Sequence, residues 1–165
     1  MALIFKITLF ITAFLLALVA GLFYAYTISV NLGLSRLSDT EYLRAMQSIN
    51  RAILNPWFFV SFIGSLLMLP FSTWMSFKVE GYDPSFYLLL TAAILYVVGV
   101  FGVTVFGSVP LNEALDKFDI SAATLQEMKN RRMMFEIPWN KLNLIRTLAN
   151  VLSLAALLAA IIKKF

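Results

Sequence analysis

The chain has no cysteine and no histidine among its 165 residues. Without cysteine it can form no disulfide, and it has no thiolate nucleophile and no iron–sulfur ligand. Without histidine it has no imidazole base and no histidine-ligated metal or haem. Charged residues are also scarce, because they make up 13% of the chain against about 25% in soluble domains. We therefore expect no metal site and no cofactor.

Apolar residues are abundant instead, at 61% of the chain against roughly 45–50% in soluble domains. The mean hydropathy is +0.84. A water-soluble globule of this size needs more polar surface than such a composition supplies. The composition excludes a soluble enzyme, a disordered tail and a DNA-binding module, and it indicates that the lipid bilayer is the main partner.

Four long runs without a charged residue define the predicted architecture. A helix needs about 20 apolar residues to cross the hydrocarbon core of a bilayer, and continuous rather than alternating apolar sequence excludes membrane strands. We expect one all-α integral membrane domain over 1–165, built as a four-transmembrane-helix up-and-down bundle. The predicted spans lie near residues 7–30, 56–77, 85–108 and 142–162.

Both longer connections are expected to hold an amphipathic helix. Residues 38–41, Ser-Asp-Thr-Glu, form a capping box, which predicts a helix over 39–54 that runs into the second span. The segment 121–136 combines an apolar stripe with several basic residues, as interfacial helices do. Near the end of the third span, Pro110 is expected to end or kink the helix.

The basic residues predict how the bundle is oriented. The formal net charge is +4, and the Lys and Arg residues lie between apolar runs, which is typical of membrane orientation rather than nucleic-acid binding. No nucleic-acid partner is expected. Nine of the 13 Lys and Arg residues lie in or beside the first and third connections. The positive-inside rule then places these connections in the cytoplasm and both termini outside, in the inner membrane of a bacterium.

Small residues recur every fourth position along the first span, at Ala13, Ala17, Gly21, Ala25 and Ser29. Such a ridge lets a neighbouring helix backbone approach closely. We expect it to pack against another helix of the same bundle, with a homodimer contact as the alternative. Other small residues are expected to serve the same purpose, namely Gly99, Gly102 and Gly107 in the third span and Ala149 with Ser153 in the fourth.

Polar residues near the spans are expected to converge at one membrane face, because late parts of the first and third helices meet early parts of the second and fourth. Buried polar groups in lipid are costly and need partners. These residues either satisfy one another and the headgroups, or they form a polar pocket at the mouth of an apolar bundle. No catalytic residue is identified. The candidate ligand-binding residues are Tyr24, Asn50, Arg51, Asn55, Asn112, Trp139, Asn143 and Arg146.

Several of these residues lie in blocks that resemble the anthrone oxygenase-like membrane protein family. The blocks are GLFYAY at 21–26, MQSINRAILNPWF at 46–58, VPLNEAL at 109–115 and WNKLNLIRT at 139–147. Ser108 stands where the family usually has Asn. The resemblance implies a four-helix membrane protein. It also implies, for a few members, oxidation of anthrones to anthraquinones without an obvious metal or flavin.

Two functions follow from these observations. The first is an intramembrane pocket for an apolar aromatic small molecule, with cofactor-independent oxygenation of a readily ionised phenol or enol. Arg51 or Arg146 would hold the anion, while Asn50, Asn112 and Asn143 orient its oxygens and Tyr24 and Trp139 stack on its rings. The second is a non-catalytic scaffold or accessory subunit of a homo-oligomer or larger membrane complex. A cavity of at least roughly 300 Å³ would favour the first function, and a filled interior the second.

Overall fold

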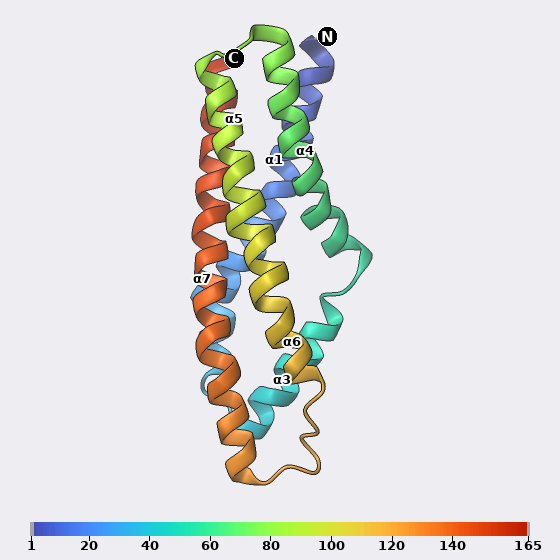
Figure 1. The fold of residues 1–165 in the computed structure, drawn as a ribbon, viewed down its shortest axis with the longest axis vertical. Coiled ribbons are helices and arrows are strands. Elements are labelled where there is room, and N and C mark those ends of the chain that lie inside the picture. The colour runs from blue at the N-terminus through green and yellow to red at the C-terminus, as the bar shows by residue number, and fades with distance from the viewer. Residues whose placement is uncertain (1, 165) are drawn as a thin grey trace.

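The computed structural model describes residues 2–164, which form a long helical bundle without a strand in that range (Figure 1). Four of its continuous helices are long and apolar enough to cross a membrane: Leu3–Leu34, Pro56–Glu80, Pro84–Asp116 and Leu125–Lys163. The predicted all-α membrane fold is confirmed. The segments in chain order are α1 (Ala2–Ala25), η1 (Tyr26–Val30), α2 (Asn31–Leu34), α3 (Asp39–Ala52), α4 (Pro56–Glu80), α5 (Pro84–Ile94), η2 (Leu95–Gly102), η3 (Thr104–Ser108), α6 (Val109–Asp116) and α7 (Leu125–Lys164), where η denotes π-helical turns.

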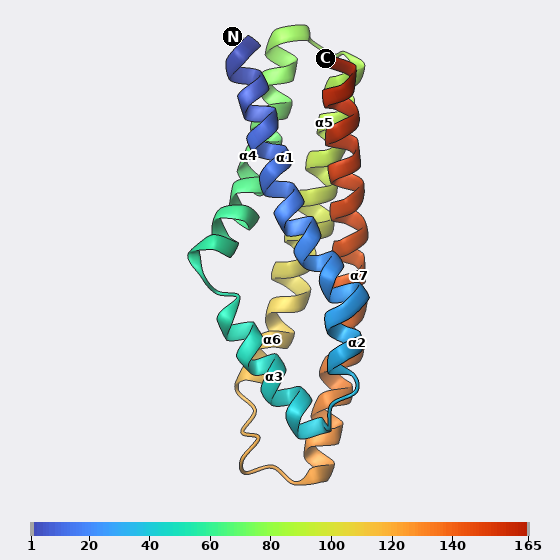
Figure 2. The same ribbon diagram turned by 180° about the vertical axis from the view of Figure 1, so that it is seen from behind.

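The long helices run up and down. Both chain ends lie at one end of the bundle, beside the turn between α4 and α5. Helix α3 and the loop between α6 and α7 lie at the other end (Figure 2). The two longer connections therefore share one side of the membrane-crossing region, because successive connections of an up-and-down bundle alternate between the two sides.

The helix starts follow the predicted caps. The Ser38 hydroxyl accepts a bond from the Glu41 amide, and the Glu41 carboxylate accepts from the Ser38 amide at 3.0 Å. The Ser38 hydroxyl also donates to the Glu41 carboxylate at 2.6 Å, and this bond, followed by the one from the Ser38 amide, lowers the pKa of the Glu41 carboxyl. Asp83 caps α5 by accepting from the Phe86 amide at 2.9 Å.

Helix α3 does not run into the second span, contrary to the prediction for 39–54. It ends at Ala52, and the chain turns before α4 starts at Pro56. The residue before a proline avoids the α conformation, and Asn55 is extended there. Its Oδ1 atom accepts from the Phe58 amide at 3.1 Å, so Asn55 caps α4 rather than continuing α3.

The third long helix does not end at Pro110. It passes through the proline and stops at Asp116. The π-helical turns η2 and η3, which widen the helix, lie before this proline in the chain. The proline itself supplies no amide hydrogen for a helical hydrogen bond. Such turns are frequent at functional sites.

The fourth long helix includes most of the predicted interfacial segment 121–136. Helix α7 begins at Leu125 and continues through Pro138 to Lys164 without a break. Its first half carries Met128 and Phe135, which are buried against the apolar face of α3. Because the apolar face of this first half of α7 packs on α3, the segment is an extension of the fourth helix beyond the bundle.

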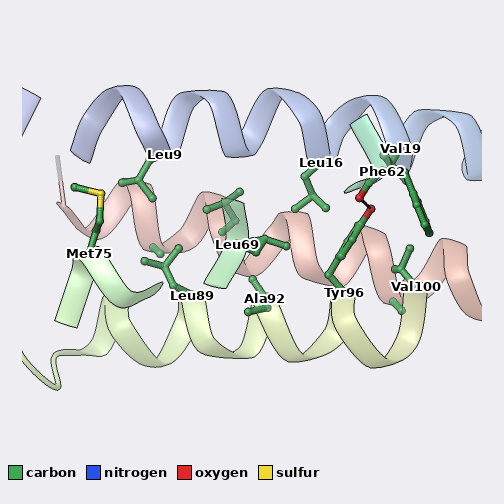
Figure 3. Packing of buried hydrophobic residues seen from close by; sticks show 14 of the residues in the cluster. Leu9, Leu16, Val19, Phe62, Leu69, Met75, Leu89, Ala92, Tyr96 and Val100 are labelled. Atoms are coloured by element: carbon green, nitrogen blue, oxygen red, sulfur yellow. Dashed lines mark hydrogen bonds between the residues drawn. The ribbon is translucent and has the colours of Figure 1, made fainter. Parts of the chain in front are cut away.

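The buried residues form two cores. The membrane core fills the bundle between α1, α4, α5 and α7, and includes Leu16, Leu69 and Tyr96 (Figure 3). There the Tyr96 hydroxyl donates to the Phe62 carbonyl at 2.8 Å. The second core joins α3, α6 and the first half of α7 through Tyr42, Leu43, Met46, Leu115, Ile120, Met128, Phe135 and Trp139.

Four of the five residues of the small-residue ridge face outward, so the prediction that the ridge packs inside the bundle is wrong for these four, while Ala13 does pack against the membrane core. Ala17, Gly21, Ala25 and Ser29 are exposed, and a Cβ atom at Gly21 would meet nothing within 4 Å. The buried face of the helix has alternating spacings of four and three, a pattern typical of left-handed helix packing. Its residues are Phe5, Leu9, Thr12, Leu16, Val19 and Phe23.

The close helix contact lies instead between the third and fourth helices. A Cβ atom at Gly99 would lie 2.6 Å from the Ala149 Cβ atom, so Gly99→Ala must push these helices apart. We expect this substitution to destabilise the protein by about 1–3 kcal/mol, measured by thermal unfolding in detergent. Gly21→Ala is the matched control and should unfold at the same or a slightly higher temperature, because alanine favours helix. Equal losses for both would contradict the assignment of the contact.

The orientation can be tested by labelling, since the native chain has no cysteine. Ser121 lies exposed in the connection before α7, and Tyr82 is 69% exposed in the turn at the opposite end. The charge distribution predicts that Ser121→Cys is labelled from the cytoplasmic side and Tyr82→Cys from the other side. A reversed pattern in intact cells would show that the basic residues do not set the topology.

Candidate functional site

A cavity of about 310 Å³ lies where the two cores meet. The first, second, third and fourth long helices and α3 all contribute to its wall. Aromatic rings make up much of the lining, from both cores: Phe23, Phe58, Phe59, Phe62, Phe101 and Trp139. Its polar lining consists of Tyr26, Asn50, Thr104, Asn112, Asn143 and Arg146.

Arg146 is the central polar residue of the cavity. It is 5% exposed, and its guanidinium carbon lies 4.5 Å from the ring centre of Phe23 and 5.5 Å from that of Trp139. The guanidinium points into the bundle and reaches the third helix. Its Nη1 atom donates to the Thr104 hydroxyl at 3.4 Å, and its Nη2 atom donates to the Asn143 side-chain oxygen at 3.3 Å.

The charge of Arg146 is not neutralised by any residue that the structure describes. The three salt bridges found within residues 2–164 involve Arg51 and Arg132, and none involves Arg146. Its Nε atom is buried and has no hydrogen-bond partner among the described residues. The two bonds it makes are longer than the usual 2.9–3.0 Å or so. The guanidinium is thus buried among aromatic rings with donor capacity to spare.

A hydrogen-bonded network determines that the oxygen of the Asn143 side-chain amide, and not its nitrogen, faces Arg146. The Asn143 amide nitrogen donates to the Thr27 hydroxyl at 3.0 Å, so its oxygen is turned toward the guanidinium. Thr147, one turn further along α7, donates to the carbonyl of Phe23 at 3.1 Å. Because Thr27 lies in the π-helical turn η1, the network ties α7 to the widened part of the first helix.

Trp139 and Asn112 form a second fixed pair. The indole Nε1 atom donates to the Asn112 side-chain oxygen at 3.0 Å. The Trp139 ring also contacts the ring of Tyr26, with centres 5.5 Å apart. Across the cavity, the Asn50 side-chain nitrogen is buried and finds no acceptor in the part of the chain that the structure describes. Asn50 and Arg146 therefore both present unused donors near one cavity.

The structure brings together five of the residues proposed from sequence. Asn50, Asn112, Trp139, Asn143 and Arg146 all line the cavity.

The other three candidates lie outside the cavity wall. Tyr24 is 51% exposed. Tyr26, two residues further along and on another face of the same helix, lines the cavity instead. Arg51 is exposed and pairs with Asp116 at the protein surface. Asn55 is occupied as the cap of α4.

Sequence reasoning did not identify several residues that form the site. Phe23, which lies under the guanidinium, could have been found because it continues the four-and-three spacing of buried positions in the first helix. Thr147 could have been found because it follows Asn143 by one turn. The π-helical turns η1 and η3 have no sequence signal comparable to a cap, although Thr27 and Thr104, which they carry, belong to the polar residues expected to converge at one membrane face.

Within residues 2–164, no group of three or more acidic residues could hold a metal ion. The cavity wall contains amide, hydroxyl and guanidinium groups, which suit an anion or a neutral polar group better than a metal cation. That the protein binds no cofactor remains a prediction.

The comparisons with known proteins support the resemblance seen in the sequence. A family model described as anthrone oxygenase matches residues 57–158, which is more than half of the chain. This range holds α4, the third long helix and nearly all of α7, and so it includes Asn112, Trp139, Asn143 and Arg146. The block at 21–26 and all but the last two residues of the block at 46–58 lie before the matched range. No curated protein and no solved structure matched the chain.

The uncompensated charge predicts the sign of a stability change. A buried charge without a counter-ion costs several kcal/mol, of which contacts with rings return about 0.5–2 kcal/mol. We expect Arg146→Met to stabilise the ligand-free protein by about 1–2 kcal/mol in detergent unfolding. The exposed Lys141→Met is the control and should change little. A strong loss of stability in Arg146→Met would mean that the guanidinium has a structural role.

Proposed function

The chain belongs to the anthrone oxygenase family, and we propose that its cavity binds an apolar aromatic small molecule as an anion and promotes its reaction with dioxygen. The observation that carries this proposal is the buried, unneutralised Arg146 between two aromatic rings. The family match supports the reaction class and the cavity supports the ligand class.

The size and the walls of the cavity fit such a ligand. Sites for small molecules commonly measure about 300–1,000 Å³ and are mostly apolar with a few placed polar groups. The cavity, at about 310 Å³, lies at the lower end of this range and suits a rigid ligand of a few fused rings. Phe23 and Trp139 offer ring faces, while Phe58 and Phe62 close the apolar side.

An anion bound here would satisfy what the protein leaves unsatisfied. It would accept from the Arg146 Nε atom and from the Asn50 side-chain nitrogen, which have no acceptor among the described residues. It would also neutralise the guanidinium, whose present bonds to Thr104 and Asn143 are long enough to be exchanged for shorter ones. A carboxylic acid, a phenol or an enol could supply the charge, and only the last two have electrons that react readily with dioxygen.

The proposed reaction balances without a cofactor. An anthrone carries a CH₂ group across the central ring from the carbonyl, and its enol tautomer carries an O–H group instead. Loss of the proton from either tautomer leaves the same delocalised anion, whose ring carbon adds to dioxygen to form one C–O bond. After protonation, the hydroperoxide loses water and leaves a ketone, so that one dioxygen is consumed and one water is released. The task of the protein is to favour the anion through Arg146 and to hold it away from bulk water.

A second candidate function is a non-catalytic membrane scaffold. It is favoured by the exposed stripe of Ala17, Gly21, Ala25 and Ser29, along which a helix of another subunit could approach closely. A homo-oligomer or a larger membrane complex would use this stripe. Such a protein would not need the cavity to bind a ligand, so a binding experiment separates the two functions.

The binding test uses 4-nitro-1-naphthol, a two-ring phenol that becomes coloured when it loses its proton. A cation beside a phenol favours the anionic form and lowers its pKa by about 1–3. We expect the pKa of the bound probe, measured by its colour over a pH series, to be lower in the wild type than in Arg146→Gln. Arg146→Lys should fall between them, because lysine keeps the charge but loses the paired donors.

Lys141→Gln is the matched control and should behave as the wild type, since Lys141 is exposed on the same helix. If Arg146→Gln binds the probe with an unchanged pKa, Arg146 does not hold the anion. If the wild type binds no probe, the scaffold is the better function. Oxygen uptake with anthrone, measured on the same variants, then separates a catalyst from a binding protein.

A further inference from the structure

Two different groups of residues border the cavity where it approaches the surface. On one side its lining includes apolar residues that are partly exposed on the outer surface of the bundle. We call these residues the lateral mouth; they are Phe59, Ile63 and Val105, with exposed fractions between 36% and 44%.

On the other side lies a second cavity of about 220 Å³, which we call the polar recess. The two cavities share four lining residues, so they adjoin. The shared residues are Asn50, Leu54, Val109 and Asn112. The rest of the recess is charged: Arg51, Glu113, Asp116 and Lys117. The Arg51 guanidinium and the Asp116 carboxylate form an ion pair there.

The two openings face different surroundings. Phe59 and Ile63 belong to α4, and Val105 belongs to the third long helix, both of which are apolar enough to cross a membrane. The charged residues of the recess lie where that same third helix ends, at Glu113, Asp116 and Lys117, and at the end of α3, at Arg51, beside the second core. The lateral mouth therefore meets lipid chains, and the polar recess meets water.

We propose that the ligand enters from the bilayer in neutral form through the lateral mouth, and that its proton leaves to water through the polar recess. This proposal rests on the proposed function of the cavity. An aromatic phenol or enol partitions into lipid when it is neutral, whereas its anion would have to cross the apolar rim at a large desolvation cost. Ionisation is favoured only beside Arg146.

The residues between the two openings fit separate routes for the ligand and for its proton. When the ligand ionises, its O–H bond breaks, the electron pair stays on its oxygen, and the proton must reach water. The shared wall offers the amides of Asn50 and Asn112, and the Glu113 carboxylate lies beyond them as a proton acceptor. Asn112 is held by the indole of Trp139, so it separates the aromatic cavity from the recess. This wall suits a proton and water better than a multi-ring ligand.

The test blocks each opening separately. The chain has no cysteine, so Val105→Cys in the lateral mouth and Glu113→Cys in the recess can each be modified with the same bulky maleimide. Val98→Cys is the control, since Val98 is 64% exposed on the same long helix and does not line the cavity. Trp57→Phe and Trp74→Phe in all variants leave Trp139 as the only tryptophan. Protein in lipid nanodiscs is mixed rapidly with 4-nitro-1-naphthol.

Two signals follow the two steps. Quenching of Trp139 fluorescence reports arrival of the probe, and appearance of colour reports its ionisation. Each modified protein is compared with its own unmodified form. We expect modified Val105→Cys to slow the quenching by at least about tenfold, which corresponds to 1.4 kcal/mol in the barrier. Modified Glu113→Cys should leave the quenching rate unchanged and slow the colour by a similar factor, while modified Val98→Cys should change neither.

The outcomes are distinct. If modification of Glu113→Cys slows the quenching and that of Val105→Cys does not, the ligand enters from water and the proposal is overturned. If the colour always follows the quenching without delay, the recess does not carry the proton, and that part is overturned. Absence of quenching in the unmodified proteins would instead contradict the proposed function itself.

Discussion

The site depends on one set of contacts, in which neutral groups hold a guanidinium that is buried in an apolar helix bundle. Arg146 rests on the rings of Phe23 and Trp139 and donates to Thr104 and Asn143. These partners come from the first, third and fourth long helices. The contacts therefore join three helices around a charge that the protein leaves without a counter-ion in the range 2–164.

The cavity exists because several helices depart from regular geometry at the same level. Helix α3 ends at Ala52, and Asn55 with Pro56 starts α4 in a new direction. The first and third long helices have π-helical turns nearby, at η1 and at η2 and η3. Regular helices there would pack the membrane core directly onto the second core. The irregular turns instead leave space and turn Thr27 and Thr104 toward the polar groups.

Much of the fold and part of the site could be predicted from the sequence. Spans, caps and the inward direction of Arg146 follow from local rules on apolar length, capping side chains and the cost of a charge in lipid. The small-residue ridge was placed wrongly because spacing alone does not choose between two faces, and the bulky face with Phe5 and Leu16 buries more area. The π-helical turns and the unbroken α7 depend on tertiary packing, which no local pattern encodes. Tyr24 was chosen over Tyr26 for the same reason, since the phase of a helix is set by its neighbours.

The residues of the site come from both inside and outside the range that the family model matches. The family match covers 57–158 and includes Arg146, Asn143, Trp139 and Asn112. The first long helix lies outside that range, yet it supplies the ring of Phe23 and the hydroxyl of Thr27 that orients Asn143. Phe23 contacts the guanidinium through its ring face, and Thr27 acts through the Asn143 amide that it orients; neither neutralises the charge. The described residues thus hold the cation in place without a counter-ion, and the anionic ligand proposed above would supply the negative charge.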